Sequence, residues 1–277
     1  DQMPAMGGVL RDGIPEYRLP KAVLDAEIDL ISSMGVKLIN NFKIGRDASL
    51  ADIKRDVDAL VVANGAWKSS PMRIAGEDAL GVYGGIDFLR ERPQIGERVA
   101  VVGGGNTAMD SCRTAKRLGA ERVFIVYRRS EAEMPARSEE VAHAEEEGVE
   151  FRFLENPVEI IGDEEGKVCA VKVLSYELGE PDASGRRSPV AIPGSEHEIP
   201  CDAMIVALGN GSNPLLVQTT PGLDADKKGH IIVNETQLTS KAKVWAGGDI
   251  VLGAATVILA MGEGRKAAAG INEYLAK

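Results

Sequence analysis

The sequence predicts an α/β fold in which glycine turns connect buried strands to helices, and three observations support it. The 277 residues are 44% hydrophobic and 27% charged, with 31 glycines and only 4% aromatic residues, a composition that suits many tight strand–helix turns. From Val99 to Arg129 a strand, a glycine turn, a helix and a second strand follow one another. The segments DALVVANG (58–65) and DAMIVALG (202–209) resemble each other, which indicates two related α/β units.

Composition and charge exclude several classes of function. The formal net charge of −10 lacks the basic balance of a nucleic-acid-binding protein, so we expect no nucleic-acid partner. The three cysteines, Cys112, Cys169 and Cys201, form no CxxC pair, and the histidines are isolated, so we expect neither a disulfide framework nor a metal site. Reduced cysteines favour a cytoplasmic location. No apolar run is long enough for a membrane span, so we expect no membrane partner.

The residues before the glycine turn predict two helices and two strands. Apolar residues at helical spacing predict a helix over 19–35, and a short strand is expected over 36–41. Ser49 is placed to cap a short helix that ends near Arg55. The continuous apolar run in 58–67 is typical of a parallel strand that is covered on both faces.

The residues after the glycine turn continue the alternation. We expect helices over 138–148 and 255–275, strands over 122–129, 149–161, 167–178, 230–234 and 243–249, and an exposed polar excursion over 179–198.

The glycine turn GGGNTA has the spacing G-x-G-x-x-A. Gly103 allows the tight turn, Gly105 lets the backbone approach a pyrophosphate, and Ala108 allows the helix to pack closely on the strand. The helix that begins at Asn106 and Thr107 directs its N–H groups and positive dipole end toward the phosphates. The flanking strand, helix and strand are the context that a dinucleotide site requires. The alternative is a glycine turn that only packs a helix.

The end of the second strand indicates which dinucleotide is bound. A site for NAD usually places an acidic residue there to hold the ribose 2′-hydroxyl. This chain has Arg128 and Arg129 instead, and guanidinium groups bind a 2′-phosphate through charge-assisted hydrogen bonds. The sequence therefore favours NADP(H) over NAD(H). The alternative is an arginine pair at a solvated strand end.

Four motifs in this order resemble a known family: GGVLRDGIPEYRLPK (7–21), VVGGGNTAMD (101–110), YRRSEAEMPA (127–136) and AGGDIVLGAATVILAMGEGRKAA (246–268). Over essentially the whole chain, the sequence resembles the small (beta) subunit of NADPH-dependent glutamate synthase and its relatives. These relatives belong to the superfamily of FAD- and NAD(P)-binding proteins that resemble pyridine nucleotide-disulfide oxidoreductases. They include the NADPH-binding subunit of an electron-bifurcating NADPH:ferredoxin transhydrogenase.

The resemblance implies a flavoprotein fold with two dinucleotide-binding domains. An NADP(H)-binding domain, residues 95–210, would be inserted into an FAD-binding domain formed by 1–94 and 211–277. NADPH would pass hydride to FAD, and iron–sulfur clusters would carry electrons onward to a large glutamate synthase-type subunit or an electron-carrier protein. No catalytic acid or base is expected, because hydride moves directly between the cofactors.

The resemblance also assigns cofactor contacts to particular residues. For NADPH they are Gly105, Asn106, Thr107, Arg128, Arg129 and Arg137. For FAD they are Gly248, Asp249, Ala254, Ala255 and Thr256, with Gly8 and Leu10 in a segment that lines the flavin. An Asp after two glycines can accept a hydrogen bond from a ribityl hydroxyl, and a helix N-terminus beside the flavin favours negative charge. The alternative is an ordinary strand-to-helix turn with an Asp cap.

Two features of the family are missing from the sequence. No G-x-G-x-x-G motif precedes Val99, and no cysteine precedes Cys112. The chain therefore looks truncated at its N-terminus, and we expect an incomplete FAD site, with any iron–sulfur cluster confined to the missing region. Two functions stay open: an NADPH-dependent flavin oxidoreductase, or an NADP(H)-binding module without turnover of its own.

Overall fold

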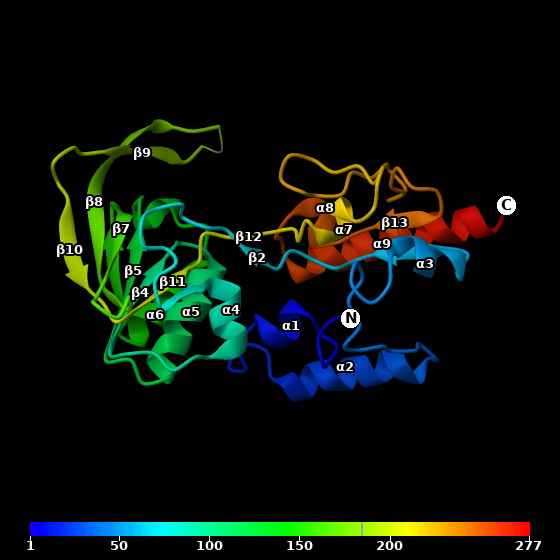
Figure 1. Ribbon diagram of the computed structural model, residues 1–277, viewed down its shortest axis with the longest axis horizontal. Helices are drawn as coiled ribbons and strands as arrows, with labels where there is room; N and C mark the ends of the chain where they lie inside the picture. Colours follow the sequence, from blue (N-terminus) through cyan, green and yellow to red (C-terminus); the bar gives the residue numbers. More distant parts are fainter. Residues whose placement is uncertain (184) are drawn as a thin grey trace. The chain divides into compact units, whose positions relative to one another are not determined.

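The computed structural model describes residues 1–183 and 185–277, which divide into two compact units (Figure 1). The inserted unit comprises Asp12–Arg18 and Ser69–Gly209, and the flanking unit comprises Asp1–Arg11, Leu19–Lys68 and Asn210–Lys277. None of the helices in these residues has the length and apolar character needed to span a bilayer.

The inserted unit contains two sheets. Its elements are β3 (Val82–Gly84), α4 (Gly85–Glu91), β4 (Arg98–Val102), α5 (Asn106–Arg117), β5 (Arg122–Tyr127), the 3₁₀ turn η1 (Glu131–Glu133), α6 (Ser138–Glu146), β6 (Glu150–Phe153), β7 (Glu155–Gly162), β8 (Val168–Pro181), β9 (Arg187–Ala191), β10 (His197–Pro200) and β11 (Ala203–Val206). One sheet is parallel, in the order β3-β11-β4-β5-β6. The other is antiparallel, in the order β10-β8-β7, with β9 also paired to β8.

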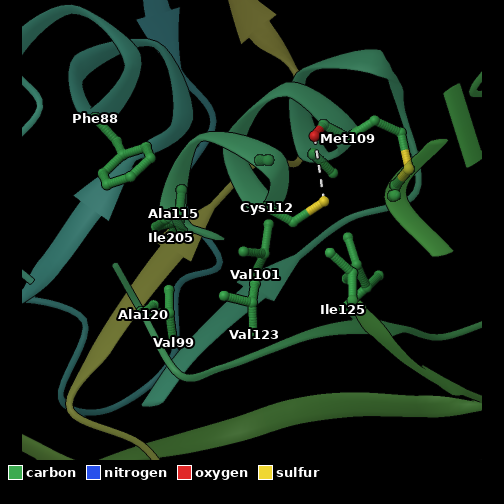
Figure 2. Close-up of a cluster of buried hydrophobic side chains, with 14 of the residues drawn as sticks. Phe88, Val99, Val101, Met109, Cys112, Ala115, Ala120, Val123, Ile125 and Ile205 are labelled. Carbon is green, nitrogen blue, oxygen red and sulfur yellow. Dashed lines mark hydrogen bonds between the residues drawn. The ribbon is translucent and has the colours of Figure 1, made fainter. Parts of the chain in front are cut away.

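The parallel sheet is covered on both faces. Successive side chains of a strand point in opposite directions, so each strand contributes residues to two cores. Val99 and Val101 of β4 pack with residues of α4, α5 and α6, whereas Ala100 and Val102 pack with residues of the antiparallel sheet. Figure 2 shows the helical side of this core, where Cys112 donates a hydrogen bond from Sγ to the Met109 carbonyl oxygen at 3.2 Å. The lack of polar alternation in these strands follows from burial on both sides.

The flanking unit has a smaller core. Its elements are α1 (Val9–Asp12), α2 (Lys21–Ser33), α3 (Leu50–Arg55), β1 (Leu60–Val62), α7 (Leu215–Gln218), β13 (Val244–Ala246), α8 (Asp249–Leu252) and α9 (Val257–Leu275), with β2 (Lys68–Ser69) and β12 (Asn210–Gly211) where the chain passes between units. Strand β1 pairs with β13 in parallel, and Val62, Val244 and Ile250 lie in the core. Ser49 caps α3 as predicted, since its Oγ accepts a hydrogen bond from the Asp52 N–H at 3.1 Å.

Three sequence expectations differ from the structure. Residues 36–41 form no strand, and Val36 and Ile39 are about half exposed, so no sheet covers them. Residues 230–234 form only isolated bridges. The excursion over 179–198 contains the end of β8, all of β9 and the start of β10.

The long segment of the inserted unit begins at Ser69, whereas the sequence placed a domain boundary after residue 94. The physical reason is that β3 pairs with β11 at the edge of the parallel sheet, and Phe88 of α4 belongs to the core beneath α5. The far boundary, Gly209, lies next to the expected residue 210.

Candidate nucleotide-binding site

The first two glycines of the turn after β4 are required by the protein itself. Gly103 has φ +137°, and a Cβ there would lie 2.4 Å from the Ala207 carbonyl oxygen. A Cβ on Gly104 would lie 2.7 Å from the ring of Tyr127. Ala108, the small residue that ends the motif, is fully buried against this turn. These residues therefore bring α5 close to the sheet, as the motif predicts.

Gly105 is different, because nothing in the protein fills the space beside it. A Cβ there would have the Pro135 Cγ atom, 3.9 Å away, as its nearest neighbour. Gly105 is the N-cap of α5, and no side chain caps the helix. Within the part of the chain that the structure describes, the N–H groups of Asn106 and Thr107 have no hydrogen-bond acceptor. Free N–H groups and open space at a helix N-terminus are suited to a phosphate.

The segment before α6 reaches this same helix end. The backbone N–H of Ala136 donates to the Gly104 carbonyl oxygen at 3.0 Å, and the backbone N–H of Arg137 donates to the Asn106 Oδ1 atom at 3.1 Å. The side chain of Arg137 is exposed. The structure therefore brings Gly105, Asn106, Thr107 and Arg137 together, although about thirty residues of chain separate the last from the others.

The two arginines after β5 have different environments. Arg128 is exposed, and its guanidinium forms no ion pair with any described residue. Arg129 is 6% exposed, donates from Nε to the Arg187 carbonyl oxygen at 2.8 Å and pairs through Nη2 with the Asp182 Oδ2 atom at 2.6 Å. Neither partner of Arg129 was expected from the sequence.

An open groove of about 570 Å³ lies beside these arginines and is lined by Ser130, Glu131, Ala132 and Phe153. Ser130 follows Arg129 directly, and Phe153 ends β6, the strand next to β5. The groove is thus at the carboxyl end of the parallel sheet, where ligands bind in open α/β folds.

The residues expected to contact FAD lie in the flanking unit. Gly248 follows β13 with φ +78°, and a Cβ on Gly247 would lie 3.2 Å from the Glu263 backbone, so both glycines let α9 approach the strand. Asp249 begins α8, and its Oδ1 accepts a hydrogen bond from the Ala255 N–H at 3.3 Å. Burial raises the pKa of Asp249, and that hydrogen bond opposes the shift.

The remaining FAD residues are accessible. Ala254, Ala255 and Thr256 are exposed, and Thr256 is the N-cap of α9 without a side-chain cap. Gly8 has φ +53°, with the Trp67 ring 3.6 Å from a Cβ built there, and Leu10 is a half-buried residue of α1.

Comparison with known proteins identifies the family. A profile described as pyridine nucleotide-disulphide oxidoreductase matches residues 16–264. The chain belongs to this family. The match confirms the superfamily that the four sequence motifs indicated.

Two curated oxidoreductase subunits are similar in sequence to almost the whole of this chain. The chain is 44% identical to the beta subunit of NADP(+)-dependent formate dehydrogenase of Moorella thermoacetica, across 99% of this chain and 40% of that subunit. It is 40% identical to the glutamate synthase [NADPH] small chain of Escherichia coli K12, across 99% of this chain and 62% of the relative. The chain thus spans only part of the length of these curated relatives.

Solved structures of the same fold agree with the architecture. FprA from Mycobacterium tuberculosis, solved in complex with NADPH, has a TM-score of 0.80 and 20% identity, over 99% of this chain and 76% of FprA. Thioredoxin reductase from T. acidophilum has a TM-score of 0.62 and 21% identity, over 80% of this chain and 67% of that one. The predicted α/β fold with two dinucleotide-binding domains is confirmed at the level of fold.

Proposed function

We propose that this chain is the NADPH-binding part of an NADPH-dependent flavin oxidoreductase and that it supplies part of the FAD site. One observation carries the proposal: the N-terminus of α5 offers unpaired N–H groups and an open space at Gly105, with the exposed Arg128 at the end of the next strand. A pyrophosphate and a 2′-phosphate need donors at these two places.

In the inserted unit, the chain's own residues bind and orient the nucleotide. The N–H groups of Asn106 and Thr107 donate to the pyrophosphate oxygens, and the dipole of α5 favours their negative charge. Arg128 binds the 2′-phosphate and thereby distinguishes NADPH from NADH. Arg137, at the N-terminus of α6, provides a further cation near the helix end.

In the flanking unit, Asp249 and the N-terminus of α9 hold the flavin. The Oδ2 atom of Asp249 has no hydrogen-bond donor among the described residues and can accept one from a ribityl hydroxyl. The chemistry would be a hydride transfer, which NADPH would supply and FAD would accept when both are bound. The positive end of α9 favours negative charge beside it, so no side-chain acid or base is required.

The names of the relatives support a role within a larger assembly. They include a formate dehydrogenase beta subunit, a glutamate synthase small chain and an NADPH-Fe(3+) oxidoreductase subunit beta from Geobacter sulfurreducens. We infer that the electrons leave the flavin for a partner, either a large glutamate synthase-type subunit or an electron-carrier protein.

The test is the visible absorption spectrum of the purified chain before and after anaerobic addition of NADPH, together with calorimetric titration of NADPH and NADH. A flavin band that bleaches with NADPH supports reductase activity in this chain. A colourless chain that binds NADPH more tightly than NADH supports an NADP(H)-binding part without turnover of its own. A chain that does not prefer NADPH contradicts the proposal.

A further inference from the structure

We propose that the β8–β9 hairpin determines nucleotide specificity, with Arg187 as a second ligand of the 2′-phosphate and Arg129 as the residue that positions it. The inference rests on the proposed function, since it deepens the NADPH site described above. It also changes the expected role of Arg129, which the sequence analysis predicted to bind the 2′-phosphate directly.

The first step is the burial of Arg129. Only 6% of the residue is exposed, and its side chain points to the hairpin, where Nη2 pairs with Asp182 and Nε donates to the Arg187 carbonyl oxygen. Asp182 follows β8 and Arg187 begins β9, so one guanidinium holds both strands of the hairpin. A buried guanidinium that is already committed to two acceptors is a poor ligand for an incoming anion.

The second step is the position of the Arg187 side chain. Its Nε donates to the Glu133 Oε1 atom at 2.6 Å, and its Nη2 lies 3.4 Å from the Ser130 Oγ atom. Ser130 lines the groove and directly follows the arginine pair. The hairpin therefore adds a cation to the place where Arg128 is expected to bind the phosphate.

The third step is that Arg187 keeps donors for a ligand. Its side chain is 48% exposed, whereas Glu133 is 6% exposed and also accepts a hydrogen bond from Ser130 at 2.5 Å. Glu133 thus fixes Arg187 through one side of the planar guanidinium. The other side remains open to a phosphomonoester, which a guanidinium binds in bidentate geometry.

The loop after β5 and the hairpin are also each held by contacts of their own. The Tyr127 hydroxyl donates to the Glu133 carbonyl oxygen at 2.8 Å, which holds η1 against the end of β5. Strand β9 pairs with β8 from Tyr176 to Pro181. The site is therefore assembled from β5, η1 and the hairpin.

The test measures dissociation constants of NADPH and NADH for the whole chain by calorimetry. In Arg187→Ala we expect NADPH binding to weaken about tenfold, the effect of one charge-assisted contact, while NADH binding is unchanged. Arg187→Lys keeps the charge and should lose less. The control is Arg122→Ala, which removes an arginine and an exposed ion pair with Glu150 at the opposite end of β5 and should change neither constant.

The variant Asp182→Asn distinguishes a role in positioning the hairpin from the simple electrostatic effect of the Asp182 carboxylate on the phosphate. Removing a carboxylate near a phosphate tightens NADPH binding if charge alone matters. If Arg129 and Asp182 position the hairpin, NADPH binding weakens instead, with NADH unaffected. Melting temperatures identify any variant that fails to fold, and Arg187→Lys then decides the outcome.

Two results overturn the inference. If Arg187→Ala and Arg187→Lys keep the wild-type preference while Arg128→Ala loses it, the hairpin has no part in specificity and the proposed function stands. If the wild-type chain itself does not prefer NADPH, the proposed function fails together with the inference.

Discussion

Arg18 donates from Nη1 to both carboxylate oxygens of Asp110, at 2.8 and 2.9 Å, across 92 residues of sequence. Its Nε lies 3.1 Å from Glu140 of α6. The neighbouring Tyr17 ring is contacted by the guanidinium groups of Arg113 and Arg117 of α5, whose central carbons lie 4.6 and 4.2 Å from the ring centroid. The segment before α2 thereby belongs to the fold of the inserted unit.

Asp110 should make stability depend on pH. Burial raises its pKa to about 6, above an unfolded value of about 4, although Arg18 opposes the shift. The folded state therefore binds this proton more tightly, and the contribution of Asp110 is present below about pH 4 and lost as the pH rises through about 6. The free energy of unfolding of the wild type, relative to Asp110→Asn, should fall by up to about 3 kcal/mol over this range. Urea titrations that give a constant difference would contradict the shift.

Two neighbouring glycines should respond differently to alanine. Gly104→Ala places a methyl group against the Tyr127 ring and should lower the free energy of unfolding by about 1–3 kcal/mol. Gly105→Ala meets open space and should cost no more than about 1 kcal/mol as an N-cap change. Its methyl group would occupy the expected place of the pyrophosphate, so NADPH binding should weaken at least about tenfold. Unimpaired NADPH binding by Gly105→Ala would count against a pyrophosphate at this turn.

The two arginines after β5 should differ in their effect on stability. Arg128→Ala should weaken NADPH binding about tenfold and leave NADH binding and the melting temperature unchanged. Arg129→Ala breaks the partly buried pair with Asp182 and should cost about 2 kcal/mol of stability. Calorimetry and thermal melting of both variants test this, and an equal loss of both nucleotides in Arg128→Ala would rule out a 2′-phosphate contact.

The buried cysteines should be unreactive. Burial raises the pKa of the Cys112 thiol far above its usual range and that of Cys201 to about 12. At pH 8 the folded chain should be alkylated at neither residue, because only the thiolate reacts. Mass spectrometry after iodoacetamide treatment should show all three cysteines modified in urea, and rapid modification of Cys112 without urea would refute the packing around α5.

Local patterns were sufficient to predict the elements whose determinants are close in sequence. The glycine turn, α5, β5, α9 and the Ser49 cap depend on neighbouring residues, so the sequence predicts them. The expected strand over 36–41 was wrong because a strand needs a partner, and β propensity does not reveal whether one exists.

Contacts across the chain could not be predicted in this way. That Arg129 points inward and Arg128 outward depends on where the β8–β9 hairpin lies, and the polarity of 179–198 indicated only exposure. The ion pair between Arg18 and Asp110 has no local signal either, because the two residues lie in separate motifs far apart in the sequence.

Helix α5 is held from several directions, by the sheet beneath it, by Arg18 and Tyr17, and by ion pairs from Arg113 to Glu140 and Glu147. Its free end therefore presents a rigid set of donors rather than one that must be ordered by the ligand. Little configurational entropy is lost there on association, so most of the interaction free energy at the phosphates is realised as affinity.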